Sequence, residues 1–461
     1  MPGSAEANTD TTLDRLADFI AATRFAQLPE ALVAQAKRHL LDTLGAALAG
    51  CDSPIWRECR ALVAEEGGSA VAQLWGCAQQ ASPRQAAWLN GVAAHMYELD
   101  DTGGCDHSGA VVLPALLAAL PLATQPVDGR AFLTAMVVGY DIGRRVLEAC
   151  GGYAAHNGAG WHSTASCGVF GAAAAVSCLL RLPAAQCASA LGIAASFSGG
   201  LWGFIHDGSH TKKLHAARAA EGGVQAALLA QRGISGPAAV FEARWGGFLQ
   251  TLAGETQQPA ALTDQLGEVW KLARCSIKPY AACRGTHAAI DALGLLLKQH
   301  AVATGDIARI VVGLNPFLLE MCGTRELTSL AAAQMSLPYA LTARALFGSA
   351  ELASYDDSRR LSAEAAALMA RIELEIDHQQ GRDDEPWVRL ETVQGQQWQQ
   401  HVAVPSGSPA NPLSDAALHA KYRSLAARVL PAAQVQQLET LCLTLDNVAD
   451  VRQVAVLLAT R

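Results

Sequence analysis

The chain has 461 residues, of which 51% are hydrophobic and 16% charged, and its formal net charge at pH 7 is −8. This length and apolar content allow two domains with large buried cores. The negative net charge argues against nucleic acid as a partner, because such binding needs a clustered basic surface. We therefore expect a globular protein, in which an anionic substrate would need a locally basic pocket.

The N-terminal and apolar segments bear on the cellular compartment. The segment MPGSAEANTDTTLDRLADFI is polar and acidic, without the basic start and apolar run of a secretory signal. The apolar run at 168–180 is short, rich in alanine and closed by Arg181, which favours a buried helix over a membrane span. The twelve cysteines are scattered and form no CxxC pair, so most are predicted to be reduced core thiols. These patterns predict a cytoplasmic protein with no membrane association.

Two kinds of hydrophobic pattern, here called textures, follow one another along the chain. From Thr12 to about Ala253, alanine and leucine recur at helical periods, with glycines at the segment ends. From about Ser276 to Pro405, short alternating runs with β-branched residues, such as RIELEID, are interleaved with helical segments. After the punctuating loop SGSPANPLSD the helical texture returns.

This pattern predicts a mainly α fold. A large all-helical domain is expected from residues 1–267 together with 410–461, because the last helices return to the first texture. Residues 268–409 are expected to form a smaller inserted α/β domain that acts as a lid.

An acidic cluster lies in the predicted helical domain, at a position where the sequence predicts the end of a helix. In AAHMYELDDTGGCDHSG the carboxylates Glu98, Asp100 and Asp101 are expected in the last helical turn, and Gly103–Gly104 supplies a left-handed stop. Carboxylates at a helix C-terminus are repelled by the partial negative charge of the carbonyls. A cationic partner is therefore expected nearby.

Later segments offer such cations. GAGWHSTASCG places His162 in a Gly/Ser-rich turn before a helix, where free backbone N–H groups favour an anion. FIHDGSHTKKLHAARAA carries Lys212, Lys213 and His215 at the approach to another helix, and the two lysine side chains are expected to point in different directions. The segment QMSLPYALTARAL adds Tyr339 on a predicted helix. SIKPYAACRGTHAAID, from the lid, adds Lys278, Cys283, Arg284 and His287.

Together and in this order, these segments resemble the MmgE/PrpD family, whose members include 2-methylcitrate dehydratase, cis-aconitate decarboxylase and iminodisuccinate epimerase. The resemblance runs from HLLDTLGAALAG to the final helices, and its most specific pieces include LNGVAAHMYELDDT, GWHSTASCGVFGAAAAV, DGSHTKKLHAARAAEGGVQAALLA and SIKPYAACRGTHAAIDA. It implies a helical domain with an α/β lid, a homodimer, and catalysis without a metal or organic cofactor.

The resemblance also implies roles for single residues. Carried over by motif, it implies catalytic roles for Thr102, His107, His162, Lys212 and Tyr339. Asp101, from the acidic cluster, completes the predicted catalytic set. The predicted substrate-binding residues are Glu98, Asp100, Lys213, His215, Lys278, Cys283, Arg284 and His287. Two positions depart from the family pattern: Glu98 stands where the family has an aspartate, and Cys283 stands at or near the place of a lid histidine, with His287 close by.

The chemistry implied by the resemblance is proton movement next to a carboxylate. A base and an acid move the proton, and cations stabilise the charge that builds on the substrate. We therefore expect a cofactor-independent lyase that dehydrates or decarboxylates a small polycarboxylate. An isomerase that epimerises an amino-polycarboxylate is the alternative.

Three weaker readings remain open. The residues SHTK at 209–212 match the S-x-x-K motif of acyl hydrolases, although the chain has no K-T-G. A metal hydrolase could use Cys105, Asp106 and His107, although adjacent ligands rarely converge on one ion. A non-catalytic carboxylate-binding protein would hold the same ligand without turnover.

Overall fold

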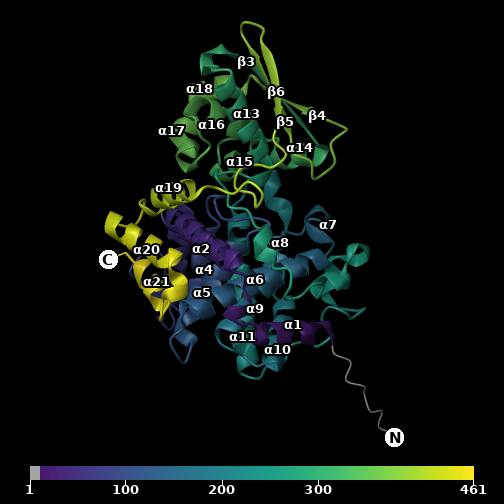
Figure 1. Cartoon of the computed structure of the whole chain (residues 1–461), viewed down its shortest axis with the longest axis vertical. Helices are drawn as coiled ribbons and strands as arrows, with labels where there is room; N and C mark the ends of the chain where they lie inside the picture. Colours follow the sequence, from purple (N-terminus) through teal and green to yellow (C-terminus); the bar gives the residue numbers. More distant parts are fainter. Residues whose placement is uncertain (1–10, 461) are drawn as a thin grey trace.

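The computed structural model describes residues 11–460, so residues 1–10, which carry part of the pattern read against a secretory signal, lie outside the described residues, as does Arg461. Figure 1 shows a large block of helices with a smaller unit of strands and helices above it. The predicted mainly α fold is confirmed. The exact bounds of the two predicted domains stay a prediction.

The larger unit consists mainly of helices. It is formed by the first part of the chain together with the C-terminal helices. Its elements before the smaller unit are α1 (Thr12–Ala22), α2 (Glu30–Gly50), α3 (Pro54–Glu66), β1 (Ala72–Gln73), β2 (Gln80–Ala81), α4 (Pro83–Ala94), α5 (Ser108–Ala119), α6 (Gly129–Ala149), α7 (Gly152–Gly158), α8 (Ser163–Ser166), α9 (Gly168–Leu179), α10 (Ala184–Ala195), α11 (Thr211–Gln231) and α12 (Phe248–Leu252). After the smaller unit come α19 (Asp415–Ala426), α20 (Ala432–Leu443) and α21 (Arg452–Leu457).

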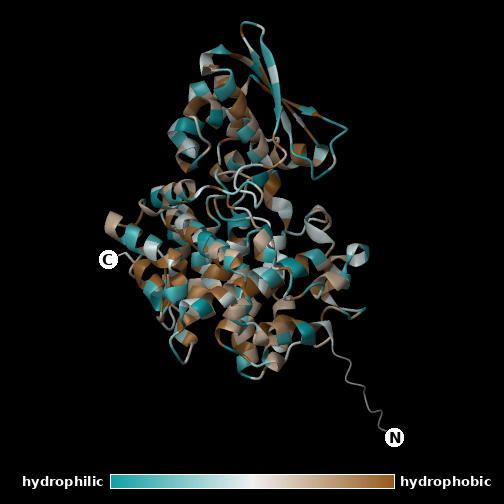
Figure 2. Cartoon of the chain, viewed as in Figure 1, coloured by the Kyte–Doolittle hydropathy of each residue, from teal (hydrophilic) through white to brown (hydrophobic). Residues whose placement is uncertain are grey.

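Helix α9 lies inside this block and is buried along nearly its whole length. Its small residues allow close packing: a Cβ added at Gly171 would lie 2.6 Å from the carbonyl oxygen of Gly139 in α6. Figure 2 shows the hydrophobic residues concentrated on the inner helices, with polar residues outside. Close packing of small and branched residues makes the block a rigid support for the loops that leave it.

The last helices fasten onto the first ones. Lys421 in α19 forms an ion pair with the buried Asp42 of α2 at 2.5 Å. The same ammonium group donates a hydrogen bond to the backbone carbonyl of Leu99 at 2.7 Å. The C-terminal segment is therefore tied to the loop that carries the acidic cluster.

The smaller unit is built on a four-stranded sheet with the strand order β4-β3-β5-β6. Strands β3 and β4 are parallel, and the pairs β3–β5 and β5–β6 are antiparallel. Apolar residues of the sheet form a second core with helices α13 and α16. The elements are α13 (His287–Gln299), β3 (Ile307–Leu314), α14 (Pro316–Cys322), α15 (Leu330–Gln334), α16 (Leu337–Phe347), α17 (Asp357–Arg360), α18 (Ala363–Met369), β4 (Ile372–Ile376), β5 (Trp387–Thr392) and β6 (Gln397–His401).

The helix before the acidic cluster ends earlier than the apolar spacing predicts. Helix α4 stops at Ala94, and the acids lie in the loop that follows it, so their predicted place in the last helical turn is wrong. The physical reason is that the acids contact partners on different sides, Glu98 the ammonium of Lys213 and Asp101 the Tyr140 hydroxyl. The backbone between them leaves the helical conformation, with φ 54° at Glu98 and 105° at Asp106. Such left-handed conformations are strained for non-glycine residues and persist where surrounding contacts over-determine them.

Two further sequence expectations concern cysteines and membranes. All twelve cysteines are free and all but Cys59 and Cys178 are buried, which confirms the predicted core thiols. Among residues 11–460, no helix joins the length and the apolar composition that crossing a bilayer requires.

Gly50 tests how tightly the helices that support the site pack. A Cβ there would lie 2.0 Å from the Ala93 carbonyl oxygen, at the end of α4. We expect Gly50→Ala to lower stability by about 1–3 kcal/mol, the usual scale of overpacking. Thermal unfolding checks this, with Gly305→Ala as the control, because a Cβ at Gly305 meets no atom of the described chain within 4 Å. Equal melting temperatures for both variants would contradict the close approach.

Candidate active site

A cavity of about 350 Å³ lies at the junction of the two units. Its walls come from the loop after α4, from the segment that leads into the smaller unit, and from the loop between β4 and β5. The charged and polar residues of its wall are Glu98, Thr102, Asp106, His107, Arg144, Tyr153, Lys212, Arg274, Ser276, Lys278, Cys283, Arg284, Asn315, Arg382, Asp383, Asp384 and Glu385. Segments far apart in the chain therefore meet in one chamber.

Glu98 is the most heavily paired carboxylate of this chamber. Its oxygens contact the ammonium groups of Lys212 at 2.9 Å, Lys213 at 2.6 Å and Lys278 at 3.4 Å. All four side chains are buried. Burial raises the pKa of Glu98, but the three lysines outweigh it and hold that pKa well below its ordinary value. Glu98 is therefore ionised, and its single charge faces three ammonium groups.

Lys213 does not point away from Lys212, so that sequence expectation is wrong. Both lysines lie in the first turn of α11, and both ammonium groups contact Oε1 of Glu98. Long flexible stems let neighbouring lysines reach one buried charge, and that charge offsets part of the desolvation of each. Lys212 lines the cavity, whereas Lys213 lies behind it.

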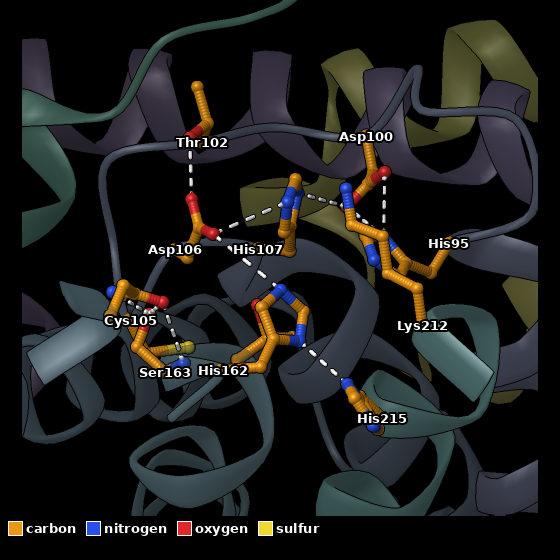
Figure 3. Close-up of polar contacts among 12 residues, drawn as sticks. His95, Asp100, Thr102, Cys105, Asp106, His107, His162, Ser163, Lys212 and His215 are labelled. Atoms are coloured by element: carbon orange, nitrogen blue, oxygen red, sulfur yellow. Dashed lines mark hydrogen bonds and ion pairs between the residues drawn. The ribbon is translucent and has the colours of Figure 1, made fainter. Parts of the chain in front are cut away.

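A second carboxylate, Asp100, orients two histidines (Figure 3). It accepts hydrogen bonds from Nδ1 of His95 at 3.1 Å and contacts Nδ1 of His107 at 2.9 Å. Although burial raises the pKa of Asp100, these imidazoles hold it well below its ordinary value. Burial also lowers the pKa of His95 to about 4, while Asp106 and Asp100 outweigh burial and raise the pKa of His107. Of these two histidines, His107 is therefore the one that binds a proton more readily.

A third carboxylate, Asp106, faces the cavity and completes the polar network of Figure 3. It accepts a hydrogen bond from the Thr102 hydroxyl at 2.9 Å, and its Oδ2 lies 3.5 Å from Nε2 of His107 and 3.8 Å from Nε2 of His162. His162 in turn contacts His215, Nδ1 to Nδ1, at 2.9 Å. Burial, together with His215 and Lys212, lowers the pKa of His162 well below its ordinary value. His162 is therefore neutral beside a more basic His107.

Asp101 points away from this network and into the helical unit. It accepts hydrogen bonds from the Tyr140 hydroxyl at 2.6 Å and from the Gly109 amide at 2.8 Å, and it contacts His39 at 2.9 Å. Its backbone carbonyl accepts a hydrogen bond from Nδ1 of His107 at 3.0 Å. Through these contacts Asp101 holds the loop against the helical unit, and its predicted catalytic role stays a prediction.

The smaller unit and its entry segment supply Lys278, Cys283 and Arg284 to the cavity wall. Cys283 lies beside Cys322, and the contact between these thiols lowers the pKa of Cys283 to about 6 against the effect of burial; Lys212 and Lys278 add to the lowering. Arg284 forms an ion pair with Glu385 at 2.7 Å across the wall. The thiol of Cys283 is therefore more acidic than an ordinary cysteine.

Other predicted residues lie outside the cavity wall. Tyr339 is fully buried in α16, and its hydroxyl donates to the carbonyl of Ser354 at 2.5 Å. His287 donates from Nε2 to the carbonyl of Ala282 at 3.2 Å. The predicted roles of both residues in catalysis or binding stay predictions. The predicted residues that do not line the wall are Asp100, Asp101, His162, Lys213, His215, His287 and Tyr339.

Several residues of the site carry no signal in the sequence. Gln334 donates to the backbone carbonyls of Tyr97 at 2.6 Å and Ala281 at 3.0 Å, and so joins the loop of Glu98 to the entry of the smaller unit. For His95, the only signal in the sequence is that a histidine stands three residues before Glu98. The arginines that sequence reasoning missed in the wall are Arg144, Arg274 and Arg382.

The weaker readings find less support in these contacts. The hydroxyl of Ser209 contacts that of Thr211 at 3.4 Å, while the ammonium of Lys212 pairs with Glu98, which disfavours S-x-x-K chemistry. The thiol of Cys105 accepts a hydrogen bond from Ser108 at 3.2 Å, and burial raises its pKa. A buried neutral thiol is a poor metal ligand, which disfavours a site built on Cys105.

The fold and the site define a class of protein with two units, mainly helical, whose junction encloses buried carboxylates, histidines and lysines. The sequence matches the MmgE/PrpD N-terminal domain over residues 14–260 and the MmgE/PrpD C-terminal domain over residues 280–447. The chain therefore belongs to the MmgE/PrpD family, as its motifs predict.

Similar curated proteins carry decarboxylase names. The cis-aconitate decarboxylase-like protein oryM of Aspergillus oryzae is 30% identical over 471 residues, which cover 96% of each chain. A cis-aconitate decarboxylase of Aspergillus terreus is 28% identical over 451 residues, 92% of this chain and 91% of its own. The human cis-aconitate decarboxylase is 29% identical over 374 residues, 76% of this chain and 74% of its own.

The thiol of Cys283 gives a pH-dependent test of the chamber. With a pKa of about 6, it is a thiolate above that pH and a thiol below it. Because the thiolate is the reactive form, we expect iodoacetamide to alkylate Cys283 with a rate that reaches half its maximum near this pH. Peptide mass spectrometry after brief exposure measures this, with the buried Cys105 as the unreactive control. Alkylation that begins only near the ordinary thiol pKa of about 8.5 would contradict it.

Proposed function

We propose that this protein is a lyase that acts without a cofactor on a small polycarboxylate, by proton transfer next to a carboxylate group. Similarity to proteins named cis-aconitate decarboxylase supports the lyase class. It makes decarboxylation of an unsaturated tricarboxylate such as cis-aconitate the first candidate reaction. Dehydration of a hydroxylated tricarboxylate such as 2-methylcitrate is the second.

The observation that carries this proposal is the excess of positive charge around Glu98. One carboxylate faces three ammonium groups, and two of them, Lys212 and Lys278, line the cavity. Arg144 and Arg274 in the same wall share one partner, Glu148. A ligand with several carboxylates would balance these cations, whereas a neutral or cationic ligand would leave them uncompensated.

The acid–base groups lie against this cationic wall. Thr102, Asp106 and His107 line the cavity, and His107 is oriented by Asp100 from behind. In a decarboxylation, the carbon–carbon bond to the leaving carboxylate breaks, CO₂ departs, and the electron pair spreads toward a neighbouring carboxylate. Lys212 and Lys278 stabilise that charge, and His107 delivers the proton that completes the product.

Epimerisation is a third candidate because acid–base groups reach the cavity from both units. His107 comes from the helical unit and Cys283 from the smaller one. Inversion at carbon needs a base on one face to remove the proton and an acid on the other face to return it. An amino-polycarboxylate such as iminodisuccinate would suit the same cations.

A substrate panel in deuterated water decides among these reactions. The panel contains cis-aconitate, 2-methylcitrate, citrate and iminodisuccinate, each followed by NMR with the protein as purified. We expect turnover of one tricarboxylate, with deuterium appearing at a single carbon of the product. Loss of CO₂ identifies a decarboxylase and loss of water a dehydratase, whereas deuterium exchange without loss identifies an epimerase. Binding without any turnover would contradict an enzyme.

Lys212 is the residue with the largest expected effect. Lys212→Ala should lower kcat/KM by about 10²–10³, the scale for removing one electrostatic stabiliser of a transition state. Lys213→Ala should lower it far less, because Lys213 contacts Glu98 from behind the cavity wall.

Lys298→Ala, on the exposed side of α13, is the control for mutation at a lysine away from the site. Steady-state kinetics give the ratio, and thermal unfolding checks that each variant folds. Equal losses for Lys212→Ala and Lys213→Ala, or unfolding of Lys212→Ala, would assign the lysine cluster to structure alone.

A further inference from the structure

Three buried histidines beside the cavity converge in a way that the proposed reaction does not require. One ring nitrogen from each of His95, His107 and His162 lies within 4.8 Å of those of the other two. The side chains are 0%, 4% and 0% exposed. We propose that these histidines form a binding site for one borderline transition-metal ion, such as Zn²⁺ or Co²⁺, and that the bound ion inhibits the enzyme.

The three nitrogens lie somewhat farther apart than in a metal-bound set. Zn–N bonds of about 2.0–2.1 Å in a tetrahedron place ligand nitrogens about 3.4 Å apart. Binding would therefore draw the three nitrogens closer together than they lie here. Imidazole ligands favour zinc, cobalt, nickel or copper over magnesium and calcium, which prefer oxygen.

The surroundings of the three rings resemble the outer shell of metal-binding histidines. Nδ1 of His95 and Nδ1 of His107 are both held by Asp100, and Nδ1 of His162 by His215. Contacts of this kind orient the rings of metal-binding histidines. Nε2 of His107 and Nε2 of His162 both face Asp106, and Nε2 of His162 also contacts the Thr164 hydroxyl at 3.4 Å, so an arriving ion would displace the proton of His107.

One of these Nε2 atoms has no use within the protein. Nε2 of His95 is buried and has no hydrogen-bond partner among the described residues. A buried polar atom without a partner is unfavourable by roughly 1–3 kcal/mol, and coordination would remove this penalty. The free donor is therefore an independent observation that points to a ligand.

Asp106 offers a fourth ligand. Its Oδ2 lies 3.5 Å from Nε2 of His107 and 3.8 Å from Nε2 of His162, on the cavity side. The three lysines are engaged by Glu98, so Asp100 and Asp106 remain to balance the charge of the ion.

Inhibition rests on the proposed function, whereas binding does not. An ion held by Nε2 of His107 and by Asp106 occupies the atoms that face the substrate, so proton transfer by His107 stops. A chelator should therefore leave activity intact or raise it.

Binding is tested without any substrate, on full-length protein freed of metal by a chelator. Titration with Co²⁺ should give the visible absorption of a four-coordinate ion, saturating at one ion per chain. His95→Asn should weaken Co²⁺ affinity by at least the roughly 10–100-fold that loss of an outer-shell partner costs. His39→Asn, at an equally buried histidine that contacts Asp101 outside the cluster, should retain it. Thermal unfolding verifies that both variants fold.

Inhibition is tested on the substrate that the panel identifies, with free Zn²⁺ held by a metal buffer because polycarboxylates chelate it. We expect Zn²⁺ to inhibit the wild type and His39→Asn at lower concentration than His95→Asn. Absence of Co²⁺ absorption, unchanged affinity in His95→Asn, or a sulfur-to-metal charge-transfer band would overturn the site. Full activity at saturating Zn²⁺, or activity that a chelator abolishes, would overturn the inhibitory role. If no substrate turns over, the proposed function fails while the Co²⁺ result still decides the site.

Discussion

The candidate site depends on the pairing of one carboxylate, Glu98, with three ammonium groups. A buried lysine is stable only with a counter-charge, because removing an ion from water costs several kcal/mol. Lys212 and Lys213 come from the start of α11 and Lys278 from the segment that enters the smaller unit, so the charge that stabilises them also joins the two units. Since one negative charge cannot balance three positive ones, the same pairing prepares the cavity for an anion.

Neighbouring acids in the loop after α4 contact different parts of the molecule, because the chain there is not helical. Asp100 turns toward the histidines beside the cavity, whereas Asp101 turns toward Tyr140 and the Gly109 amide. One acid thereby sets the protonation of the histidines, and the next fixes the loop to the helical block. In a helical turn these two side chains would lie about 100° apart on one surface and could not serve opposite sides.

Much of this arrangement could be predicted from the sequence. The change from helical to alternating texture predicted the mainly α fold, and the motifs placed Glu98, Thr102, His107 and Lys212 near one another. The rest depends on tertiary contacts that have no local signal. The end of α4, the direction of Lys213 and the entry of Arg144 and Arg382 into the wall are set by packing between distant segments. Tyr339 shows the converse, because a residue in a matching motif lies buried against Tyr355 instead of in the wall.

The contact between Lys421 and the Leu99 carbonyl has a consequence for biosynthesis. The helical unit is discontinuous, and its closing helix α19 is translated after the whole smaller unit. Domains that are continuous in sequence can fold as they emerge from the ribosome. Here the loop of Glu98 lacks one of its anchors until α19 has emerged, so the nascent chain carries an unfinished cluster of buried charges. The candidate site is therefore completed only after the C-terminal helices are made, although most of its residues are made early.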